Sequence, residues 1–240
     1  MTELDRPSPI ETPVWLELNG RPSCTWLCTP SLLDALTCGW LNGEGLISDR
    51  RELIELDVDA DARWVKARTA RERLVVQKTL ASGPDDASFS LERIPEEAPR
   101  SVPDLALLIA SGELRSSFQE MYQRCPLRAS GGGVHSGALL VDGEVLFIAE
   151  DVGRHNVTDK IIGAAMLEGV PLRGSLILIS ARISAEIAVK AWRGGVGGVA
   201  TISVPTSLAR DIARRAGVWL VGRSLRGSPY VYEPAGEASS

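Results

Sequence analysis

Long hydrophobic runs are absent from this 240-residue sequence. No stretch approaches the roughly 18 apolar residues that a membrane-spanning helix needs, so we expect no membrane segment. The first residues, MTELDRPSPIETP, are acidic and rich in proline. They lack the basic start and the apolar core of a secretory signal. These absences predict a cytoplasmic protein that does not associate with membranes.

Cysteine and histidine are also scarce. The four cysteines, Cys24, Cys28, Cys38 and Cys125, form no C-x-x-C pair, and the chain has only two histidines. Cys24 and Cys28 lie in a segment that alternates like a strand. A zinc site needs several ligands of these types at suitable spacing. We therefore predict buried, reduced structural thiols and no metal site.

An excess of positive charge is missing as well. The formal net charge is −5, from 26 Lys and Arg against 31 Asp and Glu, which argues against nucleic-acid binding. The charge is unevenly divided: residues 1–124 carry 14 basic and 21 acidic side chains (−7), whereas residues 125–240 carry 12 and 10 (+2). The second half therefore suits a small anionic ligand.

The composition is that of a globular protein, and the chain divides into five segments. Residues 1–12 are predicted to be a disordered leader. Residues 13–81 are predicted to form an antiparallel α+β region that opens on a hairpin turning at Asn19-Gly20 and continues with a helix capped by Ser31. Residues 82–104 contain four prolines and few apolar side chains, which indicates a loop or linker.

Residues 105–232 have a different pattern, and residues 233–240 are a tail. A helical segment with a break at Ser111-Gly112 is followed by a hairpin turning at Asp142-Gly143, and then by strands and helices in alternation. The order β-β-α-β-α-β-α-β predicts an α/β domain with a largely parallel sheet covered by helices. Asn156 is the expected N-cap of the first of these later helices, and Gly169 its end.

Polar residues gather at three predicted strand-to-helix junctions. They are Arg154, His155 and Asn156 after FIAED, then Ser180, Arg182 and Ser184 after SLILIS, then Thr206 and Ser207 after TISVP. The carboxyl ends of parallel strands share one edge of an open α/β sheet, so we expect these groups to lie together. Helix N-termini and two arginines there suit a phosphate or pyrophosphate. The glycines of GGGVH, residues 131–135, would bring bare backbone close to the same ligand.

Each of these residues also has a plainer interpretation. Asn156, Ser184, Thr206 and Ser207 are suitable helix caps, and the arginines are suitable solvated surface charges. The sequence has no G-x-S-x-G, Walker A or G-x-G-x-x-G motif, and no carboxylates paired as general acid and base. The residues by themselves therefore indicate binding of an anionic ligand more strongly than a reaction.

Four motifs, in order along the chain, resemble those of the formate dehydrogenase accessory sulfurtransferases, the FdhD family. EDVGRHNVTDK at 150–160 is similar to the family run E-D-V-G-R-H-N-x-x-D-K, and GGVH at 132–135 to T-G-G-x-H. SARISAEIAVKA is similar to S-G-R-x-S-x-E-x-x-x-K, and VPTSLA to P-T-S-L-A. The resemblance implies the following ligand-binding residues: Gly132, Gly133, His135, Asp151, Arg154, His155, Asn156, Asp159, Lys160, Arg182, Ser184, Thr206 and Ser207.

The resemblance also implies a fold, a ligand and partners. The fold is a small N-terminal α+β region followed by a three-layer α/β domain similar to cytidine deaminases, without zinc. The ligand is a molybdenum bis(guanine dinucleotide)-type cofactor or GDP. The expected partners are a second copy of the chain, a cysteine desulfurase that supplies sulfur, and a molybdoenzyme client such as formate dehydrogenase.

The sequence departs from the family at its sulfur relay, a C-G-x-C-G loop. The matching stretch is TLASGPDDAS, in which Ser82 and Asp85 stand where the two cysteines belong. No cysteine lies between Cys38 and Cys125, and neither a hydroxyl nor a carboxylate can form a persulfide. Cys125, six residues before Gly131, is the remaining candidate carrier near the ligand edge.

Two hypotheses remain open. In the first, the chain keeps the ligand pocket without the relay and escorts or regulates a molybdoenzyme. In the second, it is an active sulfurtransferase that uses Cys125 or a thiol of a partner. A deaminase-like hydrolase is more distant, because His135 is followed by Ser136 and Gly137 and the H-x-E and P-C-x-x-C ligands are missing.

Overall fold

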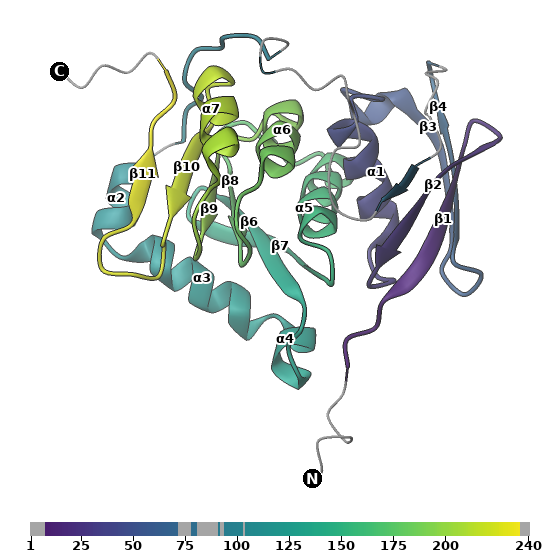
Figure 1. Cartoon of the computed structure of the whole chain (residues 1–240), viewed down its shortest axis with the longest axis horizontal. Coiled ribbons are helices and arrows are strands. Elements are labelled where there is room, and N and C mark those ends of the chain that lie inside the picture. The colour runs from purple at the N-terminus through teal and green to yellow at the C-terminus, as the bar shows by residue number, and fades with distance from the viewer. Residues whose placement is uncertain (1–7, 72–77, 81–90, 92–93, 103, 236–240) are drawn as a thin grey trace.

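Two mixed β-sheets, each covered by helices, organise the computed structural model of the chain (Figure 1). The structure describes residues 8–71, 78–80, 91, 94–102 and 104–235. Helix α1 (Leu33–Gly43) and helix α5 (Arg154–Glu168) lie between the two sheets and pack against each other. The mixed α/β class predicted from the sequence is confirmed.

The first sheet has the strand order β3–β4–β1–β2–β5. Strands β1 (Thr12–Leu18) and β2 (Arg21–Cys28) form the predicted hairpin. Strand β3 (Leu53–Asp59) pairs antiparallel with β4 (Trp64–Thr69), but β4 joins β1 in parallel, and β5 (Lys78–Leu80) joins β2 in parallel. The predicted antiparallel pairing is therefore correct for β1–β2 and β3–β4 but wrong for the other two pairs, which form between strands distant in sequence.

Helix α1 covers the inner face of this sheet. Leu36, Trp40 and Leu41 of the helix are buried against strand residues such as Leu16 and Trp26. The prediction of Ser31 as the N-cap is wrong. The helix starts one residue later than that cap requires, after Leu32, whose φ of 52° turns the chain without a capping side chain.

The second sheet has the strand order β11–β10–β9–β8–β6–β7. Strands β6 (His135–Val141) and β7 (Glu144–Asp151) form the predicted hairpin over Asp142-Gly143. Strands β8 (Leu176–Ile179), β9 (Gly198–Thr201) and β10 (Trp219–Gly222) are parallel. Strand β11 (Tyr230–Tyr232), which the sequence did not predict, adds an antiparallel edge.

Helices cover both faces of the second sheet. Helices α5, α6 (Ala185–Gly194) and α7 (Ser207–Arg215) bury one face, with Ile161, Ile187 and Ile212 in its core. Helices α2 (Leu105–Ala110) and α3 (Glu113–Gln123) bury the other face and are divided at the predicted Ser111-Gly112 break. This half is a three-layer arrangement; its likeness to cytidine deaminases stays a prediction.

The N-cap predicted for α5 is also wrong. The helix begins at Arg154 with Gly153 as its N-cap, which places Asn156 inside the first turn. The Asn156 side chain is instead occupied by a contact with Leu27, 129 positions away in sequence. The end of the helix is as predicted, since Gly169 closes it with a φ of 69°.

The interface between α1 and α5 depends on two glycines. A Cβ added to Gly39 would lie 1.9 Å from the carbonyl oxygen of Asp159, and one added to Gly163 would lie 1.8 Å from that of Ala35. Real Cβ atoms do not approach that closely, so the two helix backbones touch where no side chain intervenes. This close contact holds the first region against helix α5.

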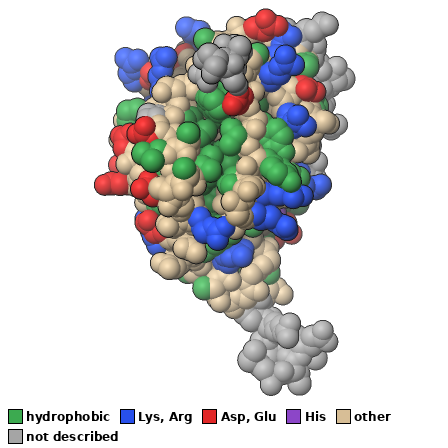
Figure 2. Space-filling model, turned by 90° about the vertical axis from the view of Figure 1, so that its left-hand side faces the viewer, with side chains coloured by type: hydrophobic (Ala, Val, Ile, Leu, Met, Phe, Trp, Pro, Cys, Tyr) green, Lys and Arg blue, Asp and Glu red, His purple; other side chains and the backbone are tan. Residues whose placement is uncertain are grey.

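Figure 2 faces the side of the molecule that carries β11 and α2. Hydrophobic side chains lie in the middle of this face, with Lys and Arg side chains around them. Exposed large apolar residues of these elements are Leu107, Tyr230 and Val231. In the part of the chain that the structure describes, no helix is long and apolar enough to cross a membrane.

Candidate functional site

The carboxyl ends of four strands meet at one edge of the second sheet. Strand β6 is antiparallel to both β7 and β8, and β8, β9 and β10 are parallel, so β7 to β10 all point the same way. The amide of Ser180 donates to the carbonyl of Ser136 at 2.8 Å, and that of Thr206 to the carbonyl of Ile183 at 2.9 Å. The three junctions therefore lie along one edge, as the sequence predicts.

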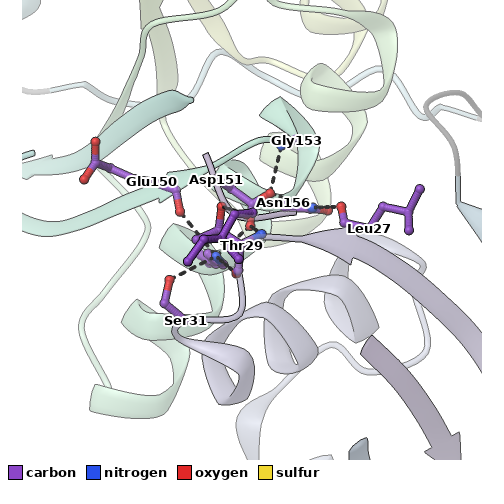
Figure 3. Close-up of polar contacts among 9 residues, drawn as sticks. Leu27, Thr29, Ser31, Glu150, Asp151, Gly153 and Asn156 are labelled. Carbon is purple, nitrogen blue, oxygen red and sulfur yellow. Dashed lines mark hydrogen bonds and ion pairs between the residues drawn. The ribbon is translucent and has the colours of Figure 1, made fainter. Parts of the chain in front are cut away.

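Part of the EDVGRHNVTDK motif is buried against the end of β2 (Figure 3). Nζ of Lys160 lies 2.6 Å from Oδ2 of Asp151, and neither side chain is exposed. Lys160 also donates to the carbonyl of Thr29 at 2.9 Å, and the Thr29 amide donates to Asp151 at 3.2 Å. Asn156 donates to the Leu27 carbonyl and to Asp151. These side chains join the first sheet to the β7–α5 junction.

A second buried ion pair lies between α5 and α6. Nζ of Lys190 lies 2.8 Å from Oδ1 of Asp159 and 3.9 Å from Oε1 of Glu186. Burial raises the pKa of Asp159 to about 7, although Lys190 opposes this effect. Burial lowers the pKa of Lys190, but Asp159, Glu186 and Glu44 outweigh it and raise that pKa, so the ammonium stays charged. Helix α1 closes over the pair at Gly43, where an added Cβ would lie 2.9 Å from Nζ of Lys190.

Glu150, which opens the same motif, faces a different element. Its carboxylate accepts from the backbone amides of Leu127 and Arg128, at 2.8 and 2.7 Å, at the start of helix α4 (Pro126–Ser130). The side chain is 7% exposed. Glu150 therefore anchors the segment that leads from α3 to the glycine turn.

Arg154, His155 and His135 lie on the partly open side of the junction. His135 begins β6 and pairs in register with Asp151 of β7. Burial, and then the charge of Arg154, lower the pKa of His135 and lower that of His155 to about 3. Both imidazoles are therefore neutral at pH 7. Arg182, at the next junction, is exposed, so these two junctions present two guanidinium groups and two neutral rings.

The hydroxyl groups of the later junctions differ in their contacts. Oγ1 of Thr206 accepts from the amide of Ala209 at 3.2 Å and caps α7. Ser184 occupies the N-cap position of α6 without a capping bond, and its Oγ lies 3.0 Å from Nε2 of His155. Ser207 is the first residue of α7, and it is exposed. The capping interpretation therefore holds for Thr206 alone.

The glycine turn precedes β6 at the same edge. Gly132 and Gly133 have φ angles of 75° and 78°, a conformation that favours glycine. Pro9 lies over this turn, since a Cβ on Gly133 would be 3.1 Å from its Cγ. The hydroxyl of Thr29 donates to the carbonyl of Ile10 at 3.2 Å. The described part of the predicted leader therefore lies against the turn.

A separate cavity lies away from this edge. It has a volume of about 720 Å³ and is lined by residues that include Asn42, Arg50, Arg100 and Arg173. It opens at the C-terminal ends of α5 and α6, at the opposite edge of the sheet. The Arg100 guanidinium there is already bonded to the carbonyls of α6. We therefore retain the carboxyl edge of the strands as the candidate site.

Comparison with known proteins identifies the family. The sequence model of the FdhD/NarQ family matches residues 9–238. The chain belongs to this family. A "Sulfur carrier protein FdhD" of Chromobacterium violaceum is 36% identical over 228 residues, covering 88% of this chain and 82% of the relative. One of Shouchella clausii is 30% identical over 237 residues, covering 95% and 88%.

A solved structure shares the fold. A formate dehydrogenase accessory protein from Desulfotalea psychrophila superposes with a TM-score of 0.76 at 24% identity, covering 94% of this chain and 88% of that one. The agreement extends over both sheets of the FdhD/NarQ chain. At 24% identity, this superposition establishes the shared fold alone. The function of the site has to be argued from the geometry of this chain.

The cysteines of this FdhD/NarQ member are all free and buried. Cys125 is fully buried in the core beside Phe118 and Met121, and burial raises its pKa. Burial also raises the pKa of Cys28 to about 12 and that of Cys38 to about 11. The replaced relay positions, 82 and 85, lie outside the described residues. In the described part of the chain, no group of three or more His, Cys, Asp or Glu side chains is arranged to hold a metal ion.

Three residues of this edge escaped the sequence prediction. Lys190 and Glu186 occupy the Lys and Glu positions of the S-G-R-x-S-x-E-x-x-x-K motif, and that match was the signal that could have found them. Arg223 follows β10, with Nη1 2.9 Å from the hydroxyl of Tyr230. Arg223 lies at the carboxyl end of β10, which is parallel to β9, so its place directly after the last predicted strand was the signal that could have found it.

Proposed function

We propose that this chain is an FdhD-type accessory protein of molybdoenzyme maturation whose strand edge binds the phosphate groups of a molybdenum bis(guanine dinucleotide)-type cofactor or of GDP. The observation that carries the proposal is the position of Arg154, Arg182 and the start of α6 on one partly open edge, beside a glycine turn. Guanidinium groups and helix N-termini are suited to pyrophosphate oxygens. The donor set therefore fits the anionic part of this ligand.

The proposal includes binding without the usual cysteine relay. Persulfide transfer requires an accessible thiolate, whereas Ser82 and Asp85 replace the relay pair and all four cysteines are buried. The name of the solved neighbour supports a formate dehydrogenase-type client. A cysteine desulfurase, a second copy of the chain and a cytoplasmic location are further expectations from the family resemblance.

Titration of the full chain with GDP in a calorimeter tests the binding proposal. We expect saturable heat that weakens when salt screens the arginines. The control is guanosine, which lacks the phosphates and should bind at least tenfold more weakly. Absence of binding at millimolar GDP, with circular dichroism showing folded protein, would contradict the proposal.

Sulfur transfer is the second candidate, because the matched relatives are named sulfur carriers. The protein is incubated with a cysteine desulfurase and cysteine, and its peptides are weighed for a gain of one sulfur. We expect no gain on Cys125, because its thiol is buried. Labelling of the wild type that is lost in Cys125→Ala would establish the transfer route instead.

A further inference from the structure

Ser184, His155 and Glu186 lie in contact with one another, in that order, at the carboxyl edge of the strands. Oγ of Ser184 lies 3.0 Å from Nε2 of His155, and Nδ1 of the same ring lies 3.4 Å from Oε2 of Glu186. The order serine, imidazole, carboxylate is that of hydrolase triads. Burial, Arg154 and Lys190 lower the pKa of His155 to about 3, far from the value near neutrality that a general base needs. The array therefore does not activate a nucleophile, and the contact between Nδ1 and Glu186 is electrostatic at this distance.

The carboxylate decides which nitrogen of His155 carries the proton. A neutral imidazole has one N–H and one acceptor nitrogen, and an ionised carboxylate can only accept. Nδ1 faces the Glu186 carboxylate, whose other oxygen lies 3.9 Å from the Lys190 ammonium. The proton therefore resides on Nδ1, and the lone pair of Nε2 faces Ser184.

This tautomer fixes the role of the Ser184 hydroxyl. A hydroxyl has one proton and two lone pairs. With the proton of the ring on Nδ1, the Ser184 hydroxyl donates its own proton to Nε2, which lies 3.0 Å away. No capping bond occupies the oxygen, and the residue is half-buried at the edge. Its lone pairs remain for a ligand, so it cannot donate to a phosphate oxygen.

We propose that Ser184 is a specificity residue that accepts a hydrogen bond from an N–H or O–H group of the ligand, with Glu186 as the positioning residue that sets this polarity through His155. The inference rests on the proposed function, in which the guanidinium groups hold the phosphates. It adds that the ligand must present a donor, such as a ribose hydroxyl or a guanine N–H. Inorganic pyrophosphate lacks such a donor only when it is fully ionised, so the comparison with GDP is made at an alkaline pH above its last ionisation.

The tautomer itself is testable without any ligand. Long-range nitrogen–proton correlation NMR distinguishes the two ring nitrogens, and His135→Asn assigns the signals because the chain has two histidines. We expect the Nδ1–H form of His155 in the wild type. In Glu186→Gln the amide can donate to Nδ1, so the Nε2–H form should increase. A wild-type ring protonated on Nε2 would overturn the proposal, whether or not GDP binds.

The specificity follows from titrations with GDP and with inorganic pyrophosphate. Ser184→Ala should bind GDP about 3- to 10-fold more weakly, the range expected for one neutral hydrogen bond, and pyrophosphate unchanged. The matched control is Ser116→Ala, an exposed serine on α3, which should change neither. Equal weakening of both ligands, or no effect on GDP, would refute the role of Ser184. Failure of the wild type to bind either ligand would refute the proposed function instead, and the NMR result would stand separately.

Discussion

The two sides of the β7–α5 junction use the same kinds of residue for different purposes. On the buried side, Lys160 and Asp151 have no exposure and bond to each other and to the end of β2. On the open side, Arg154 and Arg182 remain partly or fully exposed. The desolvation cost of burying an ion pair is offset only when further hydrogen bonds satisfy both groups. The buried side provides these hydrogen bonds. The contrast teaches that charge in a motif does not by itself mean contact with a ligand.

The helix contact that supports the buried side should be the most sensitive to change. Gly39→Ala would place a Cβ 1.9 Å from the Asp159 carbonyl, and such overpacking costs about 3 kcal/mol or more. We expect the free energy of unfolding to fall by that amount in urea titration. Gly227→Ala is the control, because nothing lies within 4 Å of a Cβ there. Equal midpoints for the two variants would contradict the close approach of α1 and α5.

Breaking the buried ion pair should destabilise the protein by a comparable amount. Lys160→Met leaves the Asp151 carboxylate buried without its cation, which typically costs about 3–5 kcal/mol. Thermal and urea unfolding measure the loss. Arg68→Met, which breaks the exposed pair with Glu55, should leave the midpoint unchanged. If both substitutions proved equally mild, Lys160 would not tie the two regions together.

Substitutions on the open side should weaken ligand binding without lowering the stability of the protein. Arg154→Ala is expected to weaken GDP binding about 10- to 100-fold, the range for a hydrogen bond between charged groups, while the unfolding midpoint stays the same. Arg115→Ala, an exposed charge on α3, provides the matched control for net charge. A variant that binds GDP normally would remove Arg154 from the site and leave the buried side as the only role of the motif.

The pH dependence of stability tests the burial of His155 at the same junction. The pKa of His155 falls from 6.5 to about 3 on folding, so between these values the unfolded chain binds a proton that the folded one does not. Stability is therefore lost as the pH falls through this window, by about 1.4 kcal/mol per pH unit for one group. The raised pKa of Asp159 acts in the opposite direction.

The contribution of His155 to the pH dependence of stability is obtained by comparing the wild type with a variant that lacks this ring. The stability of His155→Asn relative to the wild type should improve steadily from about pH 6 to about pH 4, since Asp159 is common to both proteins. His135→Asn, at the less perturbed ring, is the comparison. A constant difference across this range would mean that His155 titrates normally and that its ring is more open than the structure indicates.

Local patterns were sufficient to predict most of the second half. Alternating strands and helices led to the right order for β6 to β10, because each apolar run is short and is bounded by turn residues. The shared edge followed from the common direction of its strands. The three-residue strand β11 has no such pattern, and the parallel pairing of β1 with β4 depends on residues about 50 positions apart.

The two wrong helix starts have a common cause. Ser31 and Asn156 are good capping residues in isolation, but tertiary contacts use their side chains. The Ser31 hydroxyl accepts from Lys160, and the Asn156 amide donates to the Leu27 carbonyl. The sequence also counted Asp151, Asp159 and Lys160 among the ligand-binding residues. Their role at a ligand stays a prediction, whereas their burial within the chain is observed.

The sequence by itself determined the family, the layered α/β architecture and the group of polar residues at the strand ends. It did so because motif spacing and hydrophobic periodicity are local properties of the chain. Only the tertiary structure decided which of those residues are buried, which are open, and that Ser184 and Glu186 both lie beside the His155 ring. Burial and hydrogen-bond direction depend on neighbours that the fold brings from distant positions, such as β2 beside α5 and Glu186 beside His155.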